Sequence, residues 1–489
     1  QEEWVRALRA TVQYDHCLRR DNSPADQGES GPRLFARLSQ VECKAYLRQR
    51  GDKPAAKRYT RADIKLCTES MSKEHESRFH SLIDKHWEKT FVKDSEQLPT
   101  PFRELNHQTG RWEPVVVDYL FKPGARPVQV KCPRFVPNSP KTIVLEEIAA
   151  AGLKSGLFAP NPTSQYALRP MLVGKFEAAA DRAGVPTAIR MCGDFPPLNA
   201  TIDKAIPMNP HVEYETVKLE NKRFYCSLDA SGQYHSFLLS KKSSDASCIW
   251  FPWKGRTTRL SYQRLSMGGI NANAIAQGAF NRMFQETMGD AYHGIVCNSA
   301  DDVCFGADTI EELLEILEEV LRVLALHHVM IKPSKISFGH EFVDFWGVTY
   351  RKEGTSPSAR NLNPARRMRV PVNISELRSI LGYLNQFGRW LGPPSECTDP
   401  NERKKEALTG YRLKVRPLNA LLKAHPDPFV KRWTKEHTTI LMDFKAKLLA
   451  GAHLHNPIRD GRGFFLMTDS SVQGWGAMLM QKADDGGHL

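Results

Sequence analysis

The sequence has no run of apolar residues long enough for a membrane-spanning helix, which needs about 20 residues. Its ten cysteines form neither a CxxC pair nor a Cys/His cluster at zinc-ligand spacing. Acidic residues stand at the start, Gln1–Trp4, where a secretory signal has basic ones, and no apolar core follows. These absences disfavour a transmembrane protein, a zinc module and a secreted precursor, and they favour free thiols in a reducing, intracellular setting. The missing initiator methionine suggests a piece cut from a longer product.

The composition is that of a globular protein with a basic excess. Hydrophobic residues make up 41% and charged residues 25% of the 489 residues, enough chain for several domains. Lysine and arginine outnumber aspartate and glutamate by 68 to 55, a net charge of +13. This excess is compatible with a polyanionic partner, because basic side chains that neutralise phosphates release counterions. Composition alone does not separate a nucleic-acid-binding protein from other basic proteins.

Short strands and helices alternate irregularly from residue 114 onward, which predicts an α+β architecture rather than a regular βαβ repeat. Apolar runs predict strands at 115–117, 171–173, 188–191, 224–228 and 237–239. Helices are predicted around 145–151, over 309–328 and from about Ser375. The helix over 309–328 is the clearest, because Thr309 and Glu312 have the spacing of a capping box. Residues 1–113 show no chemistry and are predicted to be a spacer or basic attachment segment.

Three aspartates carry the chemical argument. Asp301 and Asp302 stand at the tip of a predicted hairpin, and Asp229 ends the apolar strand 224–228. An isolated Asp-Asp pair is most simply an exposed turn, but a third carboxylate at a strand end favours a site for two divalent cations about 4 Å apart. Asp229 and Asp301 are expected to bridge the cations. Strand alternation predicts that Asp302 points the other way and contributes less.

Segments in order along the chain resemble the reverse transcriptases of gypsy-class long-terminal-repeat retrotransposons, over roughly residues 114–482. Four of these segments contain or lie near the aspartates. Arg190–Asn199 (RMCGDFPPLN) is similar to RxCVDYRxLN, and Phe224–His235 (FYCSLDASGQYH) is similar to FSKLDLxSGYHQ. Leu265–Gln277 is similar to FPFGLxNAPATFQ, and the Ala300–Asp302 hairpin takes the place of YxDD. The others are Gly156–Pro160, Ile331–Phe338, Val343–Gly347 (which resembles the stretch ending in the FLG turn), Ser375–Gly382 in the thumb helix, and Phe464–Gln481 at the start of RNase H.

The resemblance implies a right-hand polymerase with an RNA or DNA template and primer, deoxynucleotides, and two Mg²⁺ ions (Mn²⁺ possible) as cofactors. It implies a role for each matching residue. Asp229, Asp301 and Asp302 would hold the metal ions and Lys335 would be the general acid; Lys175, Arg190, Tyr234, Met267, Gly268 and Gln277 would bind the nucleotide or template; and Phe345, Trp346 and Gly347 would hold the primer. Surface or core packing roles remain alternatives for Lys175, Lys335 and Tyr234.

Several positions depart from the family pattern. Ser299 stands where YxDD has tyrosine, and the fingers loop between Lys175 and Arg190 is longer than the family's. Further departures occur at Pro196, Met267 and Asn273. Asp469 would be the first metal ligand of RNase H, but the remaining acidic ligands do not follow it, so RNase H cleavage is not expected from this chain.

The expected division is a spacer (1–113), fingers and palm (114–356), thumb and connection (357–457) and a truncated RNase H start (458–489). The favoured function is RNA-directed DNA polymerase, in the cytoplasm, in virus-like particles or in the nucleus, as a monomer or homodimer, with no membrane. A degenerate polymerase fold that only binds nucleic acid is the alternative, and salt-dependent binding without incorporation would distinguish it. A group II intron-type or telomerase-type polymerase fits less well, because the thumb and RNase H segments belong to the long-terminal-repeat class.

Overall fold

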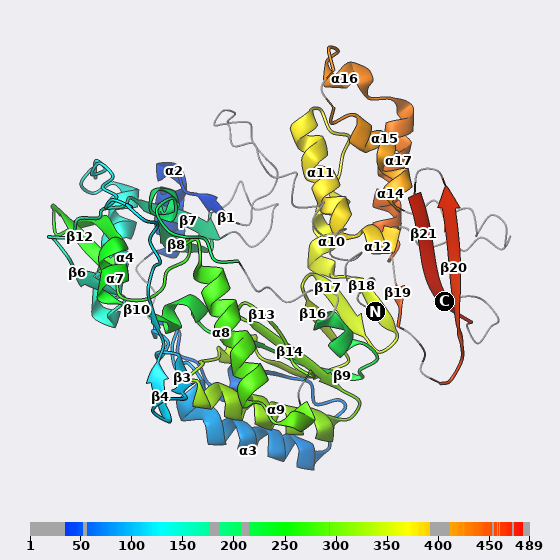
Figure 1. Cartoon of the computed structure of the whole chain (residues 1–489), viewed down its shortest axis with the longest axis horizontal. Coiled ribbons are helices and arrows are strands. Elements are labelled where there is room, and N and C mark those ends of the chain that lie inside the picture. Colours follow the sequence, from blue (N-terminus) through cyan, green and yellow to red (C-terminus); the bar gives the residue numbers. More distant parts are fainter. Residues whose placement is uncertain are drawn as a thin grey trace.

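The computed structural model describes residues 35–51, 56–175, 185–206, 215–292, 294–391, 411–423, 425–451, 454–456, 458, 460–471 and 474–482. The chain forms a central sheet with long helices beneath it, a strand-rich lobe on one side and a helical bundle on the other (Figure 1). A separate two-stranded hairpin lies beyond the bundle (Figure 1). No helix among the described residues combines the length and the apolar character needed to cross a membrane.

The central sheet has five strands in the order β13-β14-β9-β15-β2. Their bounds are Cys297–Ser299 (β13), Asp302–Ala307 (β14), Phe224–Asp229 (β9), Ser337–His340 (β15) and Lys65–Leu66 (β2). Strand β9 lies in the middle and is buried on both faces except toward its carboxyl end. Three helices pack around this sheet: α3 (Lys73–Thr90), α8 (Ala272–Thr287) and α9 (Ile310–Leu326). The strand that ends in Asp229 is therefore held on both edges and on its faces.

Within the segment predicted to be a spacer, strand β2 and helix α3 belong to this core. Helix α3 lies beside α9 under the sheet (Figure 1), and Phe79 of α3 packs on Phe338 of β15 with ring centroids 4.8 Å apart. Strand β2 pairs in parallel with β15. Sequence patterns missed this role because β2 is only two residues long and because the apolar face of α3 does not reveal which element it packs against.

Capping of α3 offers a direct test that it belongs to the folded unit. Ser72 is the N-cap, and its hydroxyl accepts a hydrogen bond from the His75 N–H at 3.1 Å. We expect Ser72→Ala to lower the free energy of global unfolding by about 1 kcal/mol, the usual cost of losing such a cap. Denaturant unfolding followed by far-ultraviolet circular dichroism measures this. An unchanged midpoint would mean that α3 unfolds independently of the sheet.

The strand-rich lobe contains two three-stranded sheets. One has the order β1-β7-β8 and the other β11-β12-β6. Their bounds are Phe35–Arg37 (β1), Pro170–Lys175 (β7), Ala188–Gly193 (β8), Cys248–Trp253 (β11), Arg256–Tyr262 (β12) and Phe158–Pro160 (β6). Helices α2 (Gln40–Arg50), α4 (Pro140–Ser155), α5 (Pro196–Asn199) and α7 (Lys241–Ala246) cover them. The Arg50 guanidinium donates to both oxygens of Glu147, at 2.8 and 2.9 Å, and ties α2 to α4.

Short pairings join this lobe to its surroundings. Strand β10 (Leu238–Leu239) pairs in parallel with β5 (Val116–Val117), and β3 (Arg103–Asn106) forms a hairpin with β4 (Arg111–Pro114). One hydrophobic core is continuous through the lobe, the central sheet and α3. The lobe and the central sheet therefore share one close-packed interior.

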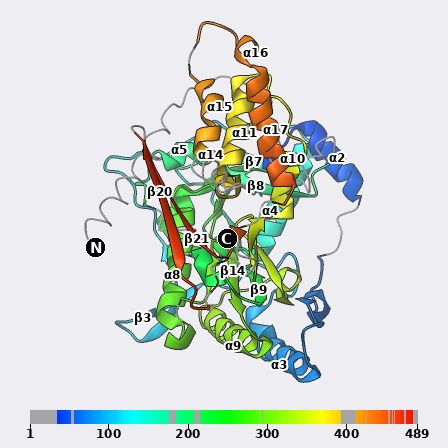
Figure 2. The same ribbon diagram turned by 90° about the vertical axis from the view of Figure 1, so that its right-hand side faces the viewer.

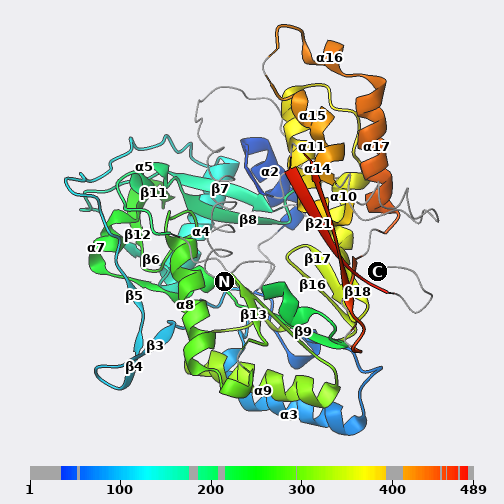
Figure 3. The ribbon, with the colours of Figure 1, turned by 45° about the vertical axis from the view of Figure 1, so that its right-hand side comes forward.

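A second core builds the helical bundle. Helices α11 (Ile374–Gln386) and α17 (Lys435–Leu449) are its longest members (Figures 1 and 2). The other helices are α10 (Ala359–Arg366), α12 (Gly388–Leu391), α14 (Tyr411–Lys414), α15 (Arg416–Ala420) and α16 (Phe429–Arg432). Helix α17 packs against α10 and α12. Beneath them lies a sheet with the order β16-β17-β18-β19 (Figure 3). Its strands are Phe342–Phe345 (β16), Val348–Arg351 (β17), Gly354–Pro357 (β18) and Leu454–His455 (β19).

The last described strands are β20 (Phe464–Ser471) and β21 (Gly474–Gln481), which pair only with each other. The second core also includes Tyr225 of β9, Cys297 of β13 and Cys304 of β14, so the bundle is packed against the central sheet. The predicted strands at 171–173, 188–191 and 224–228 and the helices over 309–328 and from Ser375 are confirmed.

Candidate active site

The three aspartates meet at one end of the central sheet. Asp229 is the last residue of β9, and Asp302, the first residue of β14, is its direct cross-strand partner. One carboxylate oxygen from each of Asp229, Asp301 and Asp302 lies within 4.8 Å of the other two. The prediction that Asp302 points away is wrong. Asp301 lies in the turn rather than in a strand, so strand alternation does not separate the two side chains, and directly paired residues share a face.

The hairpin that presents Asp301 has a two-residue turn, Ala300-Asp301, closed by the pair Ser299 and Asp302. Ala300 has a φ of 51°, a left-handed conformation that an L-residue adopts only when the surroundings hold it. The Ala230 N–H donates to the Asp301 carbonyl at 2.7 Å, so the turn is bonded to the end of β9. The backbone, and not only the side chains, therefore fixes the spacing of the acidic residues.

Gln277 of α8 supports this turn from below. Its Oε1 accepts from the Ala300 N–H at 2.7 Å, and its Nε2 donates to the Asn298 and Asn281 side-chain oxygens at 2.7 and 2.8 Å. The side chain is 2% exposed. Any part that Gln277 has in positioning a template strand is therefore indirect, because its polar atoms are inside the protein and already bonded. The side chain positions the hairpin.

The pKa values of two of the aspartates are raised, which means that the cluster disfavours three negative charges without a nearby cation. Burial, Asp301 and Asp229 raise the pKa of Asp302 to about 6, and Lys335 opposes this shift. Burial and Asp301 raise the pKa of Asp229, while Lys335 and Lys332 lower it. Both lysines lie in or beside the turn Pro333–Lys335. The predicted general acid Lys335 is thus within electrostatic reach of the cluster, and Lys332 is a second cation that the sequence argument did not single out.

Tyr234 also faces the cluster. It lies in the 3₁₀ turn Gln233–Ser236 and is half-buried. Burial and the nearby Asp301 raise the pKa of its phenol, and its hydroxyl donates to Asn273 Oδ1 at 3.5 Å. The tyrosine predicted to bind the nucleotide or template therefore lies within electrostatic reach of a predicted metal ligand.

Comparison with known proteins shows what kind of domain this geometry belongs to. The profile of the family described as "Reverse transcriptase (RNA-dependent DNA polymerase)" matches residues 187–350, which include all three aspartates. The Tf2-3 and Tf2-7 transposon polyproteins of Schizosaccharomyces pombe (strain 972 / ATCC 24843) are each 26% identical over 336 residues, which cover 68% of this chain and 22% of theirs. Residues 187–350 thus match a reverse transcriptase domain model, and the chain is similar to part of these retrotransposon polyproteins. It spans about a fifth of the length of the curated relatives it matches.

Solved structures show the fold. A foamy viral protease–reverse transcriptase in complex with double-stranded DNA superposes with a TM-score of 0.63 at 17% identity, over 94% of this chain and 68% of that chain. The foamy viral enzyme in complex with an RNA/DNA hybrid gives 0.59 at 16% identity, over 96% and 52% of the two chains. The predicted right-hand polymerase fold is confirmed. In the terms of that fold, the central sheet corresponds to the palm, the strand-rich lobe to the fingers and the helical bundle to the thumb.

In the fingers, the predicted triphosphate-binding residues occupy paired strands. Arg190 of β8 lies opposite Val173, and Lys175 of β7 lies opposite Ala188, two residues away along the same strand. The long loop between Lys175 and Arg190 therefore does not separate their strand positions. Arg190 is exposed and close enough to influence the buried His235 through its charge.

The loop that contains Met267 and Gly268 is held by an asparagine. Asn199 Nδ2 donates to the Gly268 carbonyl at 2.9 Å, and Asn199 Oδ1 accepts from the Ile270 N–H at 3.0 Å. Gly268 has a φ of 96°, and a Cβ there would come within 3.2 Å of the Phe195 ring. Glycine is therefore needed for the turn itself, and its backbone is exposed.

The predicted primer-holding residues form the turn between β16 and β17. Phe345 is 4% exposed, and Trp346 and Gly347 both have positive φ, at 50° and 77°. The Gly347 carbonyl accepts from the Ser358 N–H at 2.9 Å and from Asn361 Nδ2 at 3.2 Å, and a Cβ on Gly347 would collide with Asn361. The turn is therefore bonded to the first thumb helix, α10.

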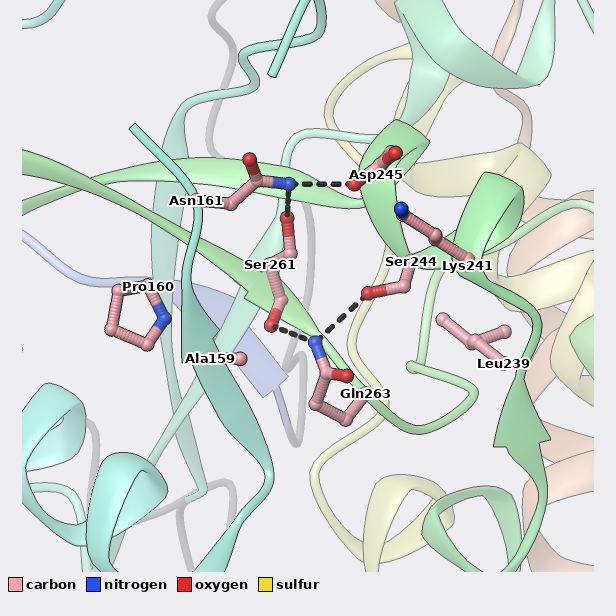
Figure 4. Close-up of a pocket in the computed structure, with 9 residues that line it drawn as sticks. All are labelled: Ala159, Pro160, Asn161, Leu239, Lys241, Ser244, Asp245, Ser261 and Gln263. Carbon is pink, nitrogen blue, oxygen red and sulfur yellow. Dashed lines mark hydrogen bonds between the residues drawn. The ribbon is translucent and has the colours of Figure 1, made fainter. Parts of the chain in front are cut away.

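Two features lie away from the palm aspartates. Asp469 is in β20, opposite Gly476, and its side chain lies outside the described residues. A polar cavity of about 420 Å³ lies between β6, β12 and α7 (Figure 4), where Asn161 donates to Asp245 at 2.7 Å and Gln263 to Ser244 at 2.9 Å. None of its lining residues belongs to the acidic cluster.

The structure adds residues that sequence reasoning missed. The buried Gln233 donates through Nε2 to the Ala300 carbonyl at 2.6 Å, so two glutamines bond the same turn residue. Lys332 stands three residues before Lys335 in the same segment, and this spacing of two cations is the signal that could have drawn attention to it. Nothing in the sequence pattern pointed to Gln233 as a support for the hairpin.

Proposed function

We propose that this chain is an RNA-directed DNA polymerase that transfers a nucleotide from a deoxynucleoside triphosphate to a primer 3′-hydroxyl. The single observation that carries the proposal is the convergence of Asp229, Asp301 and Asp302 within 4.8 Å at the tip of the palm hairpin. Three carboxylates so close together repel one another unless cations neutralise them. The retrotransposon relatives support the reaction class.

The carboxylates fit a divalent cation because all three offer hard oxygen ligands. Mg²⁺ is the proposed ion, and two ions are the proposed number, held between Asp229 and Asp301 with Asp302 as a further ligand. When bound, the ions would activate the attacking hydroxyl and neutralise charge on the triphosphate. Any such role requires the free carboxylates to lose their protons first.

The surrounding side chains supply binding and proton transfer. Lys335 lies close enough to Asp229 and Asp302 to influence both pKa values, and we propose that it gives a proton to the leaving pyrophosphate. Arg190, exposed on the fingers strand β8, would bind triphosphate oxygens through its guanidinium fork. Tyr234, half-buried beside Asp301, would fill the space that a ribose 2′-hydroxyl needs.

A primer–template is the proposed partner of the palm and thumb. The foamy viral structures that share the fold contain double-stranded DNA or an RNA/DNA hybrid. Exposed arginines gather where the thumb begins: Arg360, Arg366, Arg367, Arg369 and Arg378. Guanidinium groups that bind phosphates release counterions, so binding of a primer–template should weaken steeply with salt.

Primer extension on a poly-rA template with an oligo-dT primer tests the proposed function. Product that requires Mg²⁺ and deoxynucleotides supports it. Salt-dependent binding of the same primer–template without any incorporation would instead favour the second candidate, a polymerase fold that only binds nucleic acid. The compact acidic cluster favours the polymerase, because three mutually repelling carboxylates would not strengthen the binding of a nucleic acid.

Metal affinity should depend on pH through Asp302. Its pKa is raised to about 6, so the metal-free site holds a proton below that pH and must release it to bind a cation. We expect the affinity for Mn²⁺ to be constant above about pH 7 and to fall roughly tenfold per pH unit well below 6. Titration of Mn²⁺ by electron paramagnetic resonance between pH 5 and 8 measures this. A flat profile over that range would contradict the shift.

A further inference from the structure

One side-chain contact joins the primer-holding turn to the catalytic hairpin. The Trp346 indole N–H donates a hydrogen bond to Ser299 Oγ. Both side chains are half-buried, and the Trp346 ring also packs against Phe345 with centroids 4.9 Å apart. Trp346 has a φ of 50°, which a bulky L-residue adopts only at a cost in strain. The fold therefore holds this ring in one defined place.

Each end of the contact is attached to a different part of the enzyme. Ser299 is the strand residue paired with Asp302, and Ala300 and Asp301 follow it directly. Trp346 precedes Gly347, whose carbonyl is bonded to Ser358 and Asn361 of the thumb base.

The thumb end of this connection continues into a second helix. The Tyr383 hydroxyl of α11 donates to the Asn361 carbonyl at 2.7 Å. A continuous set of contacts thus runs from α11 through α10 and the turn 345–347 to the aspartates. Within this set the indole is the link that reaches the catalytic hairpin itself.

The sequence departs from the family pattern at both partners of this contact. Ser299 stands where YxDD has its tyrosine, and Trp346 stands where the FLG turn has its leucine. A ring is lost from the hairpin and a ring is gained on the facing turn. The structure brings these two departures into direct contact.

We propose that Trp346, held by Ser299, is a positioning residue that sets the Asp301 hairpin relative to the primer-holding turn in this enzyme. The inference rests on the proposed polymerase function and deepens it. The ring supplied by residue 346 would pack near the primer end in place of a tyrosine at 299, while its N–H fixes the hairpin. A hydrogen bond of ordinary strength, when lost, changes an equilibrium about fivefold.

Two single variants and their combination test the contact. Trp346→Phe keeps a ring and removes the donor, and Ser299→Ala removes the acceptor. We expect each to lower the maximal rate of single-nucleotide incorporation about 5- to 10-fold, with primer–template affinity changed less than twofold, and the double variant to be no slower than the slower single variant. Multiplicative losses in the double variant, or singles with wild-type rates, would overturn the proposal.

The matched control removes a like bond elsewhere. Trp433 Nε1 donates to Thr438 Oγ1 at 2.8 Å at the far end of the thumb. Trp433→Phe should lower thermal stability by an amount similar to Trp346→Phe and leave the incorporation rate within twofold of wild type. If Trp433→Phe slows incorporation as much as Trp346→Phe does, the role of Trp346 is merely structural.

An exchange of the two residues provides a gain-of-function test. Ser299→Tyr alone should lose most activity, because its ring would meet the Trp346 indole, and adding Trp346→Leu should restore at least tenfold. No restoration in a double variant that folds would count against the compensation.

Mn²⁺ binding separates this inference from the polymerase proposal. If the wild type incorporates no nucleotide, the polymerase function fails, whereas a drop of about fivefold in Mn²⁺ affinity on Trp346→Phe still supports the coupling, and no drop refutes it.

Discussion

Asp301→Asn should abolish nucleotide incorporation while leaving the fold intact. Asp301 lies in the turn of the hairpin and contributes one of three carboxylates whose oxygens lie within 4.8 Å of one another. Loss of a shared cation ligand removes several kcal/mol of transition-state stabilisation, so we expect the incorporation rate to fall by roughly 1,000-fold or more. Single-turnover primer extension with Mg²⁺ measures this rate.

The same substitution should not destabilise the metal-free protein. Removing one of the three carboxylates reduces the electrostatic repulsion among them, so the melting temperature of the variant without metal should equal or exceed that of the wild type. The rise in melting temperature on adding Mn²⁺ should be smaller than in the wild type, because the variant binds the ion more weakly. Asp308→Asn is the matched control, since Asp301 directly precedes β14, whereas Asp308 directly follows it, is exposed and pairs with Lys222 at 3.4 Å. Full activity in Asp301→Asn would sink the proposed site.

Gln277→Leu should have the second largest effect, although Gln277 touches neither metal nor substrate. The substitution removes the acceptor of the Ala300 N–H and the donor to Asn298, both bonded at 2.7 Å and both inside the protein. Buried groups left without partners cost about 1–3 kcal/mol each, so we expect a loss of roughly 2–4 kcal/mol in unfolding free energy. With the turn released, the incorporation rate should fall about 100-fold, because misplaced catalytic groups are costly.

The control for this prediction lies on the same helix. Gln285 is exposed near the end of α8, so Gln285→Leu adds a similar apolar side chain without breaking a buried bond. It should leave stability within about 0.5 kcal/mol of wild type, as surface substitutions usually do. Denaturant unfolding and primer extension compare the two variants. Equal behaviour of Gln277→Leu and Gln285→Leu would show that the hairpin holds its conformation without the glutamine.

Local sequence rules succeeded where the signal is contained in one element. The helix over 309–328 is present as Ile310–Leu326, and Thr309 caps it by accepting from the Glu312 N–H, as the spacing predicts. The reciprocal bond of the capping box differs, because Glu312 Oε2 accepts from the Asp308 N–H at 3.1 Å instead. The strand that ends at Asp229 and the hairpin that carries Asp301 were also predicted, since apolar runs and turn residues are properties of short segments.

The errors share one physical cause, which is that contacts between distant segments override local patterns. Alternation predicted that Asp302 points away, but the turn places Asp301 outside the strand and pairs Asp302 with Asp229. Gln277 was predicted to help position the template strand, and its burial against Ala300 depends on how α8 lies on the sheet. The segment 56–113 carried no motif, yet it completes the palm through β2 and α3.

The sequence by itself determined the elements, the three aspartates and the polymerase resemblance, because periodicity, turn chemistry and motif order are written in consecutive residues. Only the tertiary structure decided which side chains support the hairpin: Gln277 from α8, Gln233 from the turn after β9, and Trp346 from the thumb side. These contacts join residues 23, 67 and 47 positions apart. Hydrogen bonds of this kind depend on how whole elements pack, which no local pattern records.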